Sequence, residues 1–205
     1  LRRQRQMCIR DSNNVDGVSF TGSTKVGIEL MRGGAHNLQH VFLELGGNDP
    51  HVFFEDCDMD LAVAEAMGGR CYNAGQTCCA NKHFIVQNSI KKEFIERLIE
   101  AAKNYKIGDP SDPETAMGCL VSVKAAEAVM DEIQSVIDQG GKLLYGGKRN
   151  GAFVDPTIIE VTKENDVAKD LEIFGPVFPI IGFDTFEEAV EIANQTSYGL
   201  ASAVM

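Results

Sequence analysis

The sequence lacks any apolar run long enough to cross a bilayer, which takes about 18 or more residues. The basic opening residues 1–12 are not followed by the apolar stretch of a secretory signal. No stripe of lysine and arginine with interleaved aromatic residues offsets the formal net charge of −11, which repels nucleic acid. We therefore expect neither a membrane nor a nucleic-acid partner.

The six cysteines also lack the patterns of metal sites and of disulfide frameworks. They lie at positions 8, 57, 71, 78, 79 and 119, with no Cys-x-x-Cys pair and no zinc-finger spacing to histidine. A chain of 205 residues is long enough to bury a core without disulfides. We expect no metal, reduced thiols and a cytoplasmic location. The adjacent pair Cys78 and Cys79 is the feature that needs an explanation.

Short apolar runs alternate with helical patterns along the chain. Strands are expected at 18–21, 41–45, 51–54, 83–87, 143–144, 154–161 and 177–183, with another beginning at Leu200. Helices are expected at 24–32, from Asp60, after an N-cap at Ser89, at 123–139 and at 186–194. This alternation predicts an α/β fold with a largely parallel sheet.

Both ends of the sequence are unusual. Residues 201–205 stop inside an apparent strand, and residues 1–12 show neither a strand nor a helix period. We interpret residues 1–12 as non-native or disordered, and we expect the chain to be a fragment of a longer protein.

The segment Phe20-Thr21-Gly22-Ser23-Thr24-Lys25-Val26-Gly27 leads from a strand into a helix through small residues. Free backbone N–H groups at a helix N-terminus suit a phosphate or pyrophosphate. The spacing of the two glycines matches neither the Gly-x-Gly-x-x-Gly fingerprint nor a P-loop. Taken alone, the segment is better explained by a helix N-cap at Ser23 with no ligand.

Three further segments carry groups that can do chemistry. Gly75-Gln76-Thr77-Cys78-Cys79 is a glycine-led turn that either exposes a reactive thiolate or holds an inert, buried cysteine. Glu44, at the end of an apolar strand, is either a general base or a member of a surface salt bridge. Glu172-Ile173-Phe174-Gly175-Pro176-Val177 by itself indicates only an ordered loop.

Taken in this order, the four motifs resemble those of the aldehyde dehydrogenase superfamily. Glu44-Leu45-Gly46-Gly47 is similar to the family's general-base signature, and Gly75-Gln76-Thr77-Cys78 to its nucleophile signature. Ala193-Asn194 with Tyr198-Gly199-Leu200-Ala201 matches a further run near the family's C-terminal part. The resemblance covers roughly residues 13–205.

The resemblance implies a role for each matching residue. Cys78 would attack the aldehyde carbon, and Glu44 would activate the water that hydrolyses the resulting thioester. Ser23 would contact the pyrophosphate of the cofactor, Glu172 would hold the nicotinamide ribose, and Phe174 would pack near the nicotinamide ring. Further cofactor contacts are implied for Gly22, Gly27, Leu45 and Gly46. NAD is the favoured cofactor and NADP is possible.

The resemblance also implies an architecture. Residues 13–45 would be the C-terminal part of a Rossmann-like dinucleotide-binding domain, and residues 46–205 a parallel-sheet catalytic domain that is truncated at its C-terminus. Family members form homodimers or homotetramers and use small-molecule aldehydes. An asparagine of the oxyanion hole and a lysine that binds the adenosine ribose would lie upstream, so little or no turnover is expected from this chain alone.

Two alternatives and one finer assignment remain open. Coenzyme A could accept the acyl group in place of water, although Glu44 favours hydrolysis. The fold could instead survive as an inactive structural or binding homologue, although intact Cys78, Glu44 and Glu172 argue against this. The segments 43–50 and 73–81 are most similar to the succinate-semialdehyde and lactaldehyde branch.

Overall fold

The computed structural model describes residues 12 and 14–205, and these divide into two compact units between Gly46 and Gly47. The interpretation of residues 1–12 as non-native or disordered therefore lies outside the described residues, apart from Ser12. The same is true of Cys8.

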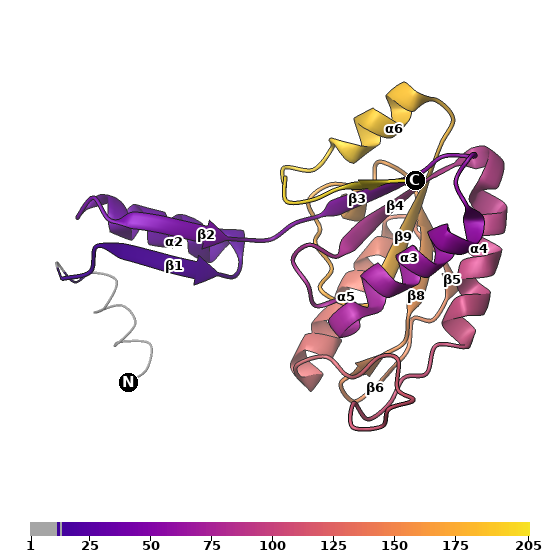
Figure 1. The fold of residues 1–205 in the computed structure, drawn as a ribbon, viewed down its shortest axis with the longest axis horizontal. Helices are drawn as coiled ribbons and strands as arrows, with labels where there is room; N and C mark the ends of the chain where they lie inside the picture. Colours follow the sequence, from indigo (N-terminus) through magenta and orange to yellow (C-terminus); the bar gives the residue numbers. More distant parts are fainter. Residues whose placement is uncertain (1–11, 13) are drawn as a thin grey trace. The chain divides into compact units, whose positions relative to one another are not determined.

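The first unit consists of two parallel strands joined by a helix (Figure 1). β1 (Gly17–Thr21) pairs with β2 (His40–Glu44), and α2 (Thr24–Ala35) makes the crossover that parallel strands require. The side chain of Ser23 accepts a hydrogen bond from the backbone N–H of Val26 at 3.4 Å, so Ser23 is the N-cap of α2.

The second unit is built on a six-stranded sheet with the strand order β10-β3-β4-β9-β8-β5. The neighbouring pairs from β10 to β8 are all parallel, and only the edge strand β5 is antiparallel. A separate antiparallel pair is formed by β6 and β7. The bounds are β3 Asp49–Phe53, β4 Asn81–Gln87, β5 Lys142–Tyr145, β6 Arg149–Asn150, β7 Phe153–Val154, β8 Thr157–Val161, β9 Val177–Phe183 and β10 Ala203–Val204.

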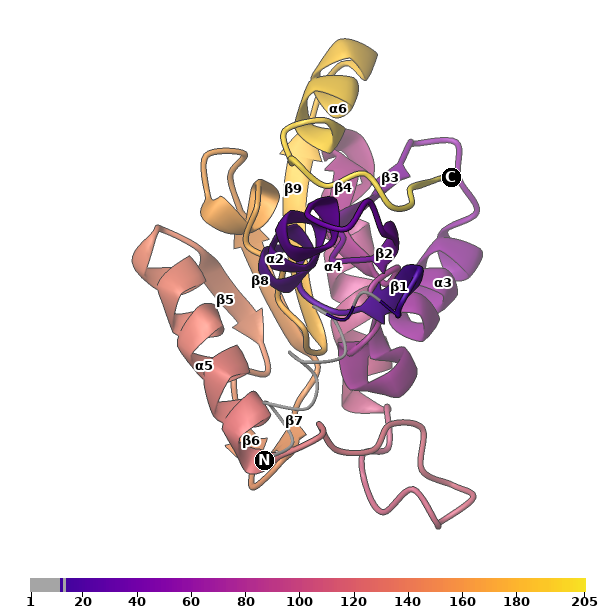
Figure 2. The same ribbon diagram turned by 90° about the vertical axis from the view of Figure 1, so that its left-hand side faces the viewer.

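Helices connect these strands and cover the sheet. Right-handed crossovers place the helix between β3 and β4 and the helix between β9 and β10 on opposite faces, because the two connections run in opposite directions along the sheet. In Figure 2 the helix before β5 lies at the left of the second unit. The helices are α3 Met59–Cys71, α4 Asn88–Lys103, α5 Val123–Asp138 and α6 Phe186–Ala193, with short 3-10 helices at Tyr72–Gly75 and Asp166–Ala168. The expected α/β fold with a largely parallel sheet is confirmed.

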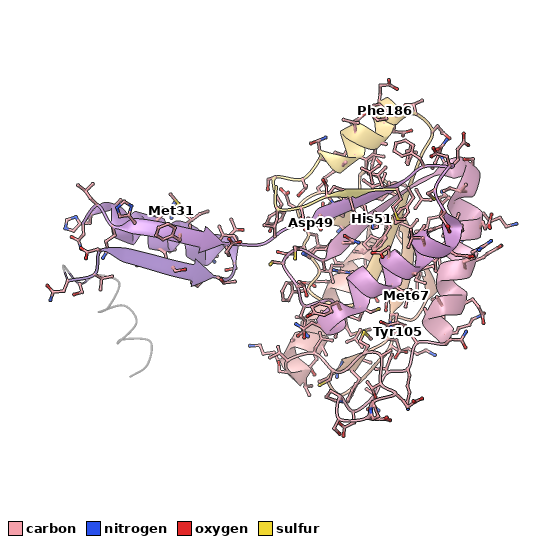
Figure 3. All side chains as sticks on the ribbon, viewed as in Figure 1. Met31, Asp49, His51, Met67, Tyr105 and Phe186 are labelled. Atoms are coloured by element: carbon pink, nitrogen blue, oxygen red, sulfur yellow. The ribbon has the colours of Figure 1, made fainter. Side chains whose placement is uncertain are left out.

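The core of the second unit lies on both faces of the central strands. All five residues of β3 are buried, as is nearly all of β9, which is the pattern of parallel strands covered on both sides. The rings of Phe53 and Phe94 lie 4.8 Å apart, and those of Phe84 and Phe178 lie 5.2 Å apart. Figure 3 shows His51 on β3 and Met67 on α3 within this interior, where both are buried.

Three sequence-based expectations differ from the structure. Ser89 is not an N-cap: α4 begins at Asn88 without a side-chain cap, and the Ser89 hydroxyl donates to Glu55. The expected strand 154–161 is two strands, because Pro156 between them has no N–H to donate. The last strand begins at Ala203 and not at Leu200, because the N–H of Ala201 bonds to the carboxylate of Asp49.

Candidate active site

The Cys78 segment follows a strained turn at the end of α3. Asn73, Ala74 and Gly75 have φ values of 50°, 55° and 77°. These lie in the left-handed region, which is unfavourable for residues other than glycine. A methyl group on Gly75 would lie 2.3 Å from the carbonyl carbon of Gly175. Glycine is therefore required at position 75, and the close approach brings the Cys78 motif against the Glu172 motif.

The side chain of Gln76 holds this turn through two hydrogen bonds. Its side-chain oxygen accepts a hydrogen bond from the N–H of Val121 at 2.8 Å, and its side-chain nitrogen donates to the carbonyl of Asn73 at 2.9 Å. Asn73 returns a side-chain hydrogen bond to the carbonyl of Gln76 at 3.0 Å. The segment that leads into Cys78 is thus held by the side chains of Gln76 and Asn73.

The cysteines around this turn differ in exposure. Cys78 is half-buried and Cys79 is exposed. Cys71, at the end of α3, is buried, and burial raises the pKa of its thiol to about 12. A thiol with so high a pKa is protonated and inert at neutral pH, so Cys71 is a packing residue.

Glu172 is held by two groups from distant parts of the second unit. Its Oε1 atom lies 3.1 Å from Nζ of Lys82 and accepts a hydrogen bond from the N–H of Gly47 at 3.3 Å. Two residues further on, the ring of Phe174 is 44% exposed. This ring lines a cleft of about 710 Å³, whose other walls include Gln76, Cys119, Leu120, Val129 and Glu132.

The residues that follow Gly47 anchor the loops on either side of the Glu172 motif. Asn48 donates from its side-chain nitrogen to the carbonyls of Val167 and Lys169, at 3.3 and 2.7 Å. Asp49 accepts a hydrogen bond from the N–H of Ala201 at 3.1 Å. Burial raises the pKa of Asp49, while the Ala201 N–H and the nearby Lys82 oppose that shift.

Arg70, near the end of α3, fixes the Glu172 motif from inside the protein. It is fully buried, and it donates to the carbonyl of Val177 at 2.6 Å and to that of Ile173 at 2.7 Å. Burial lowers its pKa to about 10, so the guanidinium remains charged at neutral pH. Burial also raises the pKa of Glu132 to about 7, with the charge on Glu172 adding to the shift.

In the first unit, the expected cofactor-binding glycines have packing reasons of their own. A methyl group on Gly22 would lie 2.4 Å from the ring of Phe20, and one on Gly27 would lie 2.6 Å from the side chain of Leu45. Gly46 is half-buried. The first turn of α2 contains no acidic residue, so its N-terminus remains suited to an anion, and the N-cap at Ser23 does not prevent this.

Glu44 is exposed, at the end of β2, where its backbone carbonyl accepts a hydrogen bond from the N–H of Gly22 at 2.9 Å. Its carboxylate makes no ion pair within residues 12 and 14–205. In that part of the chain no three His, Cys, Asp or Glu side chains are arranged to hold a metal ion. No helix there is long and apolar enough to span a membrane.

Sequence analysis missed Lys82, Arg70, Asn48 and Asp49. A lysine and an arginine near apolar residues usually indicate solvent-exposed positions. The only available signal was position: Lys82 lies in the strand directly after the Cys78 motif, and Asn48 and Asp49 directly follow the Glu44 motif.

The family model described as "Aldehyde dehydrogenase family" matches residues 3–205 of the chain. Retinal dehydrogenase 2 of Mus musculus is 43% identical over 195 residues, which cover 93% of this chain and 38% of that protein. An aldehyde dehydrogenase-like protein of Schizosaccharomyces pombe is 45% identical over 196 residues, covering 93% of this chain and 39% of that protein.

Solved structures agree with these relatives. Betaine aldehyde dehydrogenase from Staphylococcus aureus, in complex with NAD+, has a TM-score of 0.94 and 36% identity, over 98% of this chain and 41% of that one. Glyceraldehyde-3-phosphate dehydrogenase from Methanocaldococcus jannaschii, in complex with NADP, has a TM-score of 0.93 and 40% identity, over 98% and 43%. The chain thus spans about two fifths of the length of the proteins it matches.

Proposed function

This chain belongs to the aldehyde dehydrogenase family, and we propose that the protein of full family length that carries it oxidises an aldehyde to a carboxylic acid with NAD, or with NADP. One observation supports this most strongly. The half-buried Cys78 follows a turn that Gly75 and Gln76 hold against the Glu172–Phe174 segment. A thiol can serve as the nucleophile of such a reaction, and the neighbouring carboxylate and aromatic ring suit the ribose and the planar ring of a bound cofactor.

Cys78 is the proposed nucleophile. Its thiolate adds to the aldehyde carbon, forming a carbon–sulfur bond and placing the negative charge on the former carbonyl oxygen. The backbone N–H of Cys78 donates a hydrogen bond to that oxyanion. The tetrahedral carbon can then expel hydride with help from the oxyanion, which the planar aldehyde cannot do readily.

Each unit, taken by itself, has residues that suit a part of a dinucleotide. The N-terminus of α2, with Ser23 and no acidic residue in its first turn, suits the pyrophosphate. Glu172 suits ribose hydroxyls, and the exposed ring of Phe174 in its cleft suits a planar heterocycle. When bound, NAD or NADP supplies the hydride acceptor. Gly22, Gly27, Leu45 and Gly46 of the first unit are further proposed cofactor contacts.

Glu44 is the proposed general base. After hydride loss, the acyl group is attached to Cys78 as a thioester. Glu44 takes a proton from water as the water oxygen attacks the thioester carbon, and the Cys78 thiolate leaves as the acid is released.

We assign residues 13–45 to the end of the dinucleotide-binding domain and residues 46–205 to the catalytic domain.

The finer features are proposals of the same kind. We propose a homodimer or homotetramer of the full-length protein, a cytoplasmic location with reduced thiols, and little turnover from this chain alone. The motif resemblance favours a succinate-semialdehyde or lactaldehyde substrate. A lactaldehyde dehydrogenase of Methanococcus aeolicus is 39% identical over 193 residues, but identity to retinal dehydrogenase 2 is 43%, so a panel of aldehydes has to decide.

The test uses the chain completed with its upstream half, and it follows NADH or NADPH formation from a panel of aldehydes. We expect turnover without coenzyme A, abolished by Cys78→Ser. Glu44→Gln is expected to allow one stoichiometric burst of NADH and then to stop, because the thioester is not hydrolysed. A requirement for coenzyme A would establish the acylating alternative. No reduction of either cofactor, or full activity of Cys78→Ser, would overturn the proposed reaction.

A further inference from the structure

Lys82, the second residue of β4, has an unusual environment for a lysine. Its side chain is only 1% exposed, in the interior of the second unit. Removing an ammonium group from water is costly unless the group is paired and hydrogen-bonded. The partners of Lys82 therefore indicate why a lysine is retained at this position.

The Lys82 ammonium has partners from two motifs that are distant in sequence. Its Nζ donates to the backbone carbonyl of Cys78 at 2.5 Å and lies 3.1 Å from Oε1 of Glu172. The same nitrogen lies 5.9 Å from the centre of the Phe174 ring, within the range of a cation–π interaction. One ammonium thus contacts the residue that carries the thiol and both side chains proposed to hold the cofactor.

Gly47 completes this arrangement. Its N–H donates to the same Glu172 oxygen at 3.3 Å, and a methyl group at position 47 would lie 2.8 Å from the Cys78 carbonyl oxygen. Lys82 and Gly47 therefore both approach the Cys78 carbonyl and the Glu172 carboxylate. The contact with the Cys78 carbonyl restrains the backbone of the residue whose thiol must be presented to a substrate.

The charges around Lys82 come from several elements. Glu172 and Asp49 are the nearby carboxylates and Arg70 is the nearby cation. Burial lowers the pKa of Lys82, and the Coulombic attraction and hydrogen bond of Glu172 oppose that shift. Because Glu172 is itself only 17% exposed, loss of the lysine would leave its carboxylate partly buried without its cation.

We propose that Lys82 is a positioning residue that couples the Cys78 thiol to the Glu172–Phe174 segment. This inference rests on the proposed function and deepens it. A change at Glu172 should alter the reactivity of the Cys78 thiol, and Lys82 should transmit that change. The contacts of Lys82 are with the Cys78 carbonyl, Glu172 and Phe174, so we assign it a positioning role and no step of the reaction.

The first test measures iodoacetamide alkylation in the 205-residue chain, resolved by peptide mass spectrometry. We expect Lys82→Met to slow alkylation of Cys78 at least threefold at pH 8, because the variant loses the contact that restrains the backbone of Cys78. Lys82→Arg should restore at least half of the rate, since it keeps the charge and the donors. The half-buried Cys57, which does not line the cleft of Phe174, is the internal control and should react at an unchanged rate.

A double-mutant cycle separates coupling from general loosening. Glu172→Gln should change the Cys78 rate at least twofold when Lys82 is present and have no further effect in Lys82→Met. If Lys82→Met does not fold by circular dichroism, Glu172→Gln alone, with Lys82→Arg, decides the question. An unchanged Cys78 rate in folded Lys82→Met, or in Glu172→Gln, would overturn the proposal.

Turnover in the completed protein provides a second measurement. There Lys82→Met should raise KM for the cofactor and lower kcat, and Lys82→Arg should recover both. Alkylation does not depend on aldehyde oxidation, so the two proposals can fail separately. If Cys78 alkylation depends on Lys82 and Glu172 but no aldehyde is oxidised, the positioning role of Lys82 is supported and the proposed reaction is wrong. If turnover depends on Cys78 but not on Lys82, the proposed reaction is supported and the positioning role of Lys82 is wrong.

Discussion

The two units bury very different shares of their apolar residues. In the first unit, the buried residues of α2 are two glycines, and Met31, Leu38 and Phe42 are 56%, 89% and 65% exposed. In the second unit, Phe53, Phe84 and Phe178 are fully buried. Two strands and one helix do not bury a core by themselves, whereas a six-stranded sheet with helices does. The comparison teaches that the second unit carries the stability of this chain.

Removing a large side chain from each unit tests this comparison most strongly. We expect Phe84→Ala to lower the free energy of unfolding by about 3–5 kcal/mol, because Phe84 packs against Phe53 and Phe178. Phe42→Ala should change it by less than about 0.5 kcal/mol. Urea unfolding followed by circular dichroism measures both. Equal costs would show that the first unit is folded cooperatively with the second.

A second contrast concerns how closely other atoms approach a glycine in each unit. Gly75→Ala combines a left-handed backbone with a clash against Gly175, and we expect a loss of about 3 kcal/mol in unfolding free energy. Gly27→Ala in the first unit meets only the end of the Leu45 side chain, and alanine favours helices, so a change within about 1 kcal/mol is expected.

Gly151→Ala is the matched control for Gly75→Ala. Gly151 has a φ of 60°, but a methyl group there meets nothing within 4 Å. The cost should therefore be limited to the left-handed backbone, about 1 kcal/mol. If Gly151→Ala is as costly as Gly75→Ala in urea unfolding, the close approach to Gly175 is not what requires a glycine at position 75.

The third contrast concerns buried charge. Because the folded-state pKa of Glu132 is raised to about 7, the stability it contributes is present below about pH 4.5 and is lost as the pH rises through 7. Glu132→Gln should therefore be more stable than wild type at pH 8, by about 1–2 kcal/mol, and should lose this advantage by pH 4.5.

The control for that pH dependence lies in the first unit. Glu29 is 58% exposed and pairs with Arg32 on the surface of α2. Glu29→Gln is expected to change the unfolding free energy by less than about 0.5 kcal/mol at either pH. Urea unfolding at pH 4.5 and pH 8 compares the two variants. If the stability difference between Glu132→Gln and wild type is the same at pH 8 as at pH 4.5, the pKa of Glu132 is not raised in the folded protein.

The smallest expected effect concerns helix caps. Thr185 accepts a hydrogen bond from the N–H of Glu188 at the start of α6, so Thr185→Ala should cost about 1 kcal/mol in urea unfolding. Ser23→Ala removes the equivalent bond of α2, but we expect it to leave the main transition unchanged and to speed hydrogen exchange of the α2 amides. A shifted main transition in Ser23→Ala would argue for one cooperative structure.

Much of the fold was predictable from the sequence because its signals are local. The strand at 177–183 is a mainly apolar run, with Pro179 and Gly182 within it, that begins after Gly175-Pro176, and the structure has it at those residues. The helix at 123–139 has a clear apolar period, and α5 ends at Asp138. Ser89 misled because serine is a common cap, yet the chain already turns into helix one residue earlier.

The site was only partly predictable. The four motifs indicated a nucleophile turn and a cofactor loop, and the family they resemble is confirmed. The roles of Cys78, Glu44 and Glu172 stay predictions until they are measured. Nothing local in the sequence distinguishes Lys82 from an exposed lysine at a strand end, so its partners at Cys78 and Glu172 were not predicted.

The sequence by itself determined the period of each strand and helix, the positions of its glycine turns and the family of the chain. These depend on neighbouring residues along the chain, so a linear pattern carries them. Tertiary structure decided that Gly75 meets Gly175, that Arg70 is buried against the carbonyls of Ile173 and Val177, and that Lys82 reaches Glu172. Such contacts join residues about a hundred positions apart, and burial, which only the folded chain sets, determines their strength.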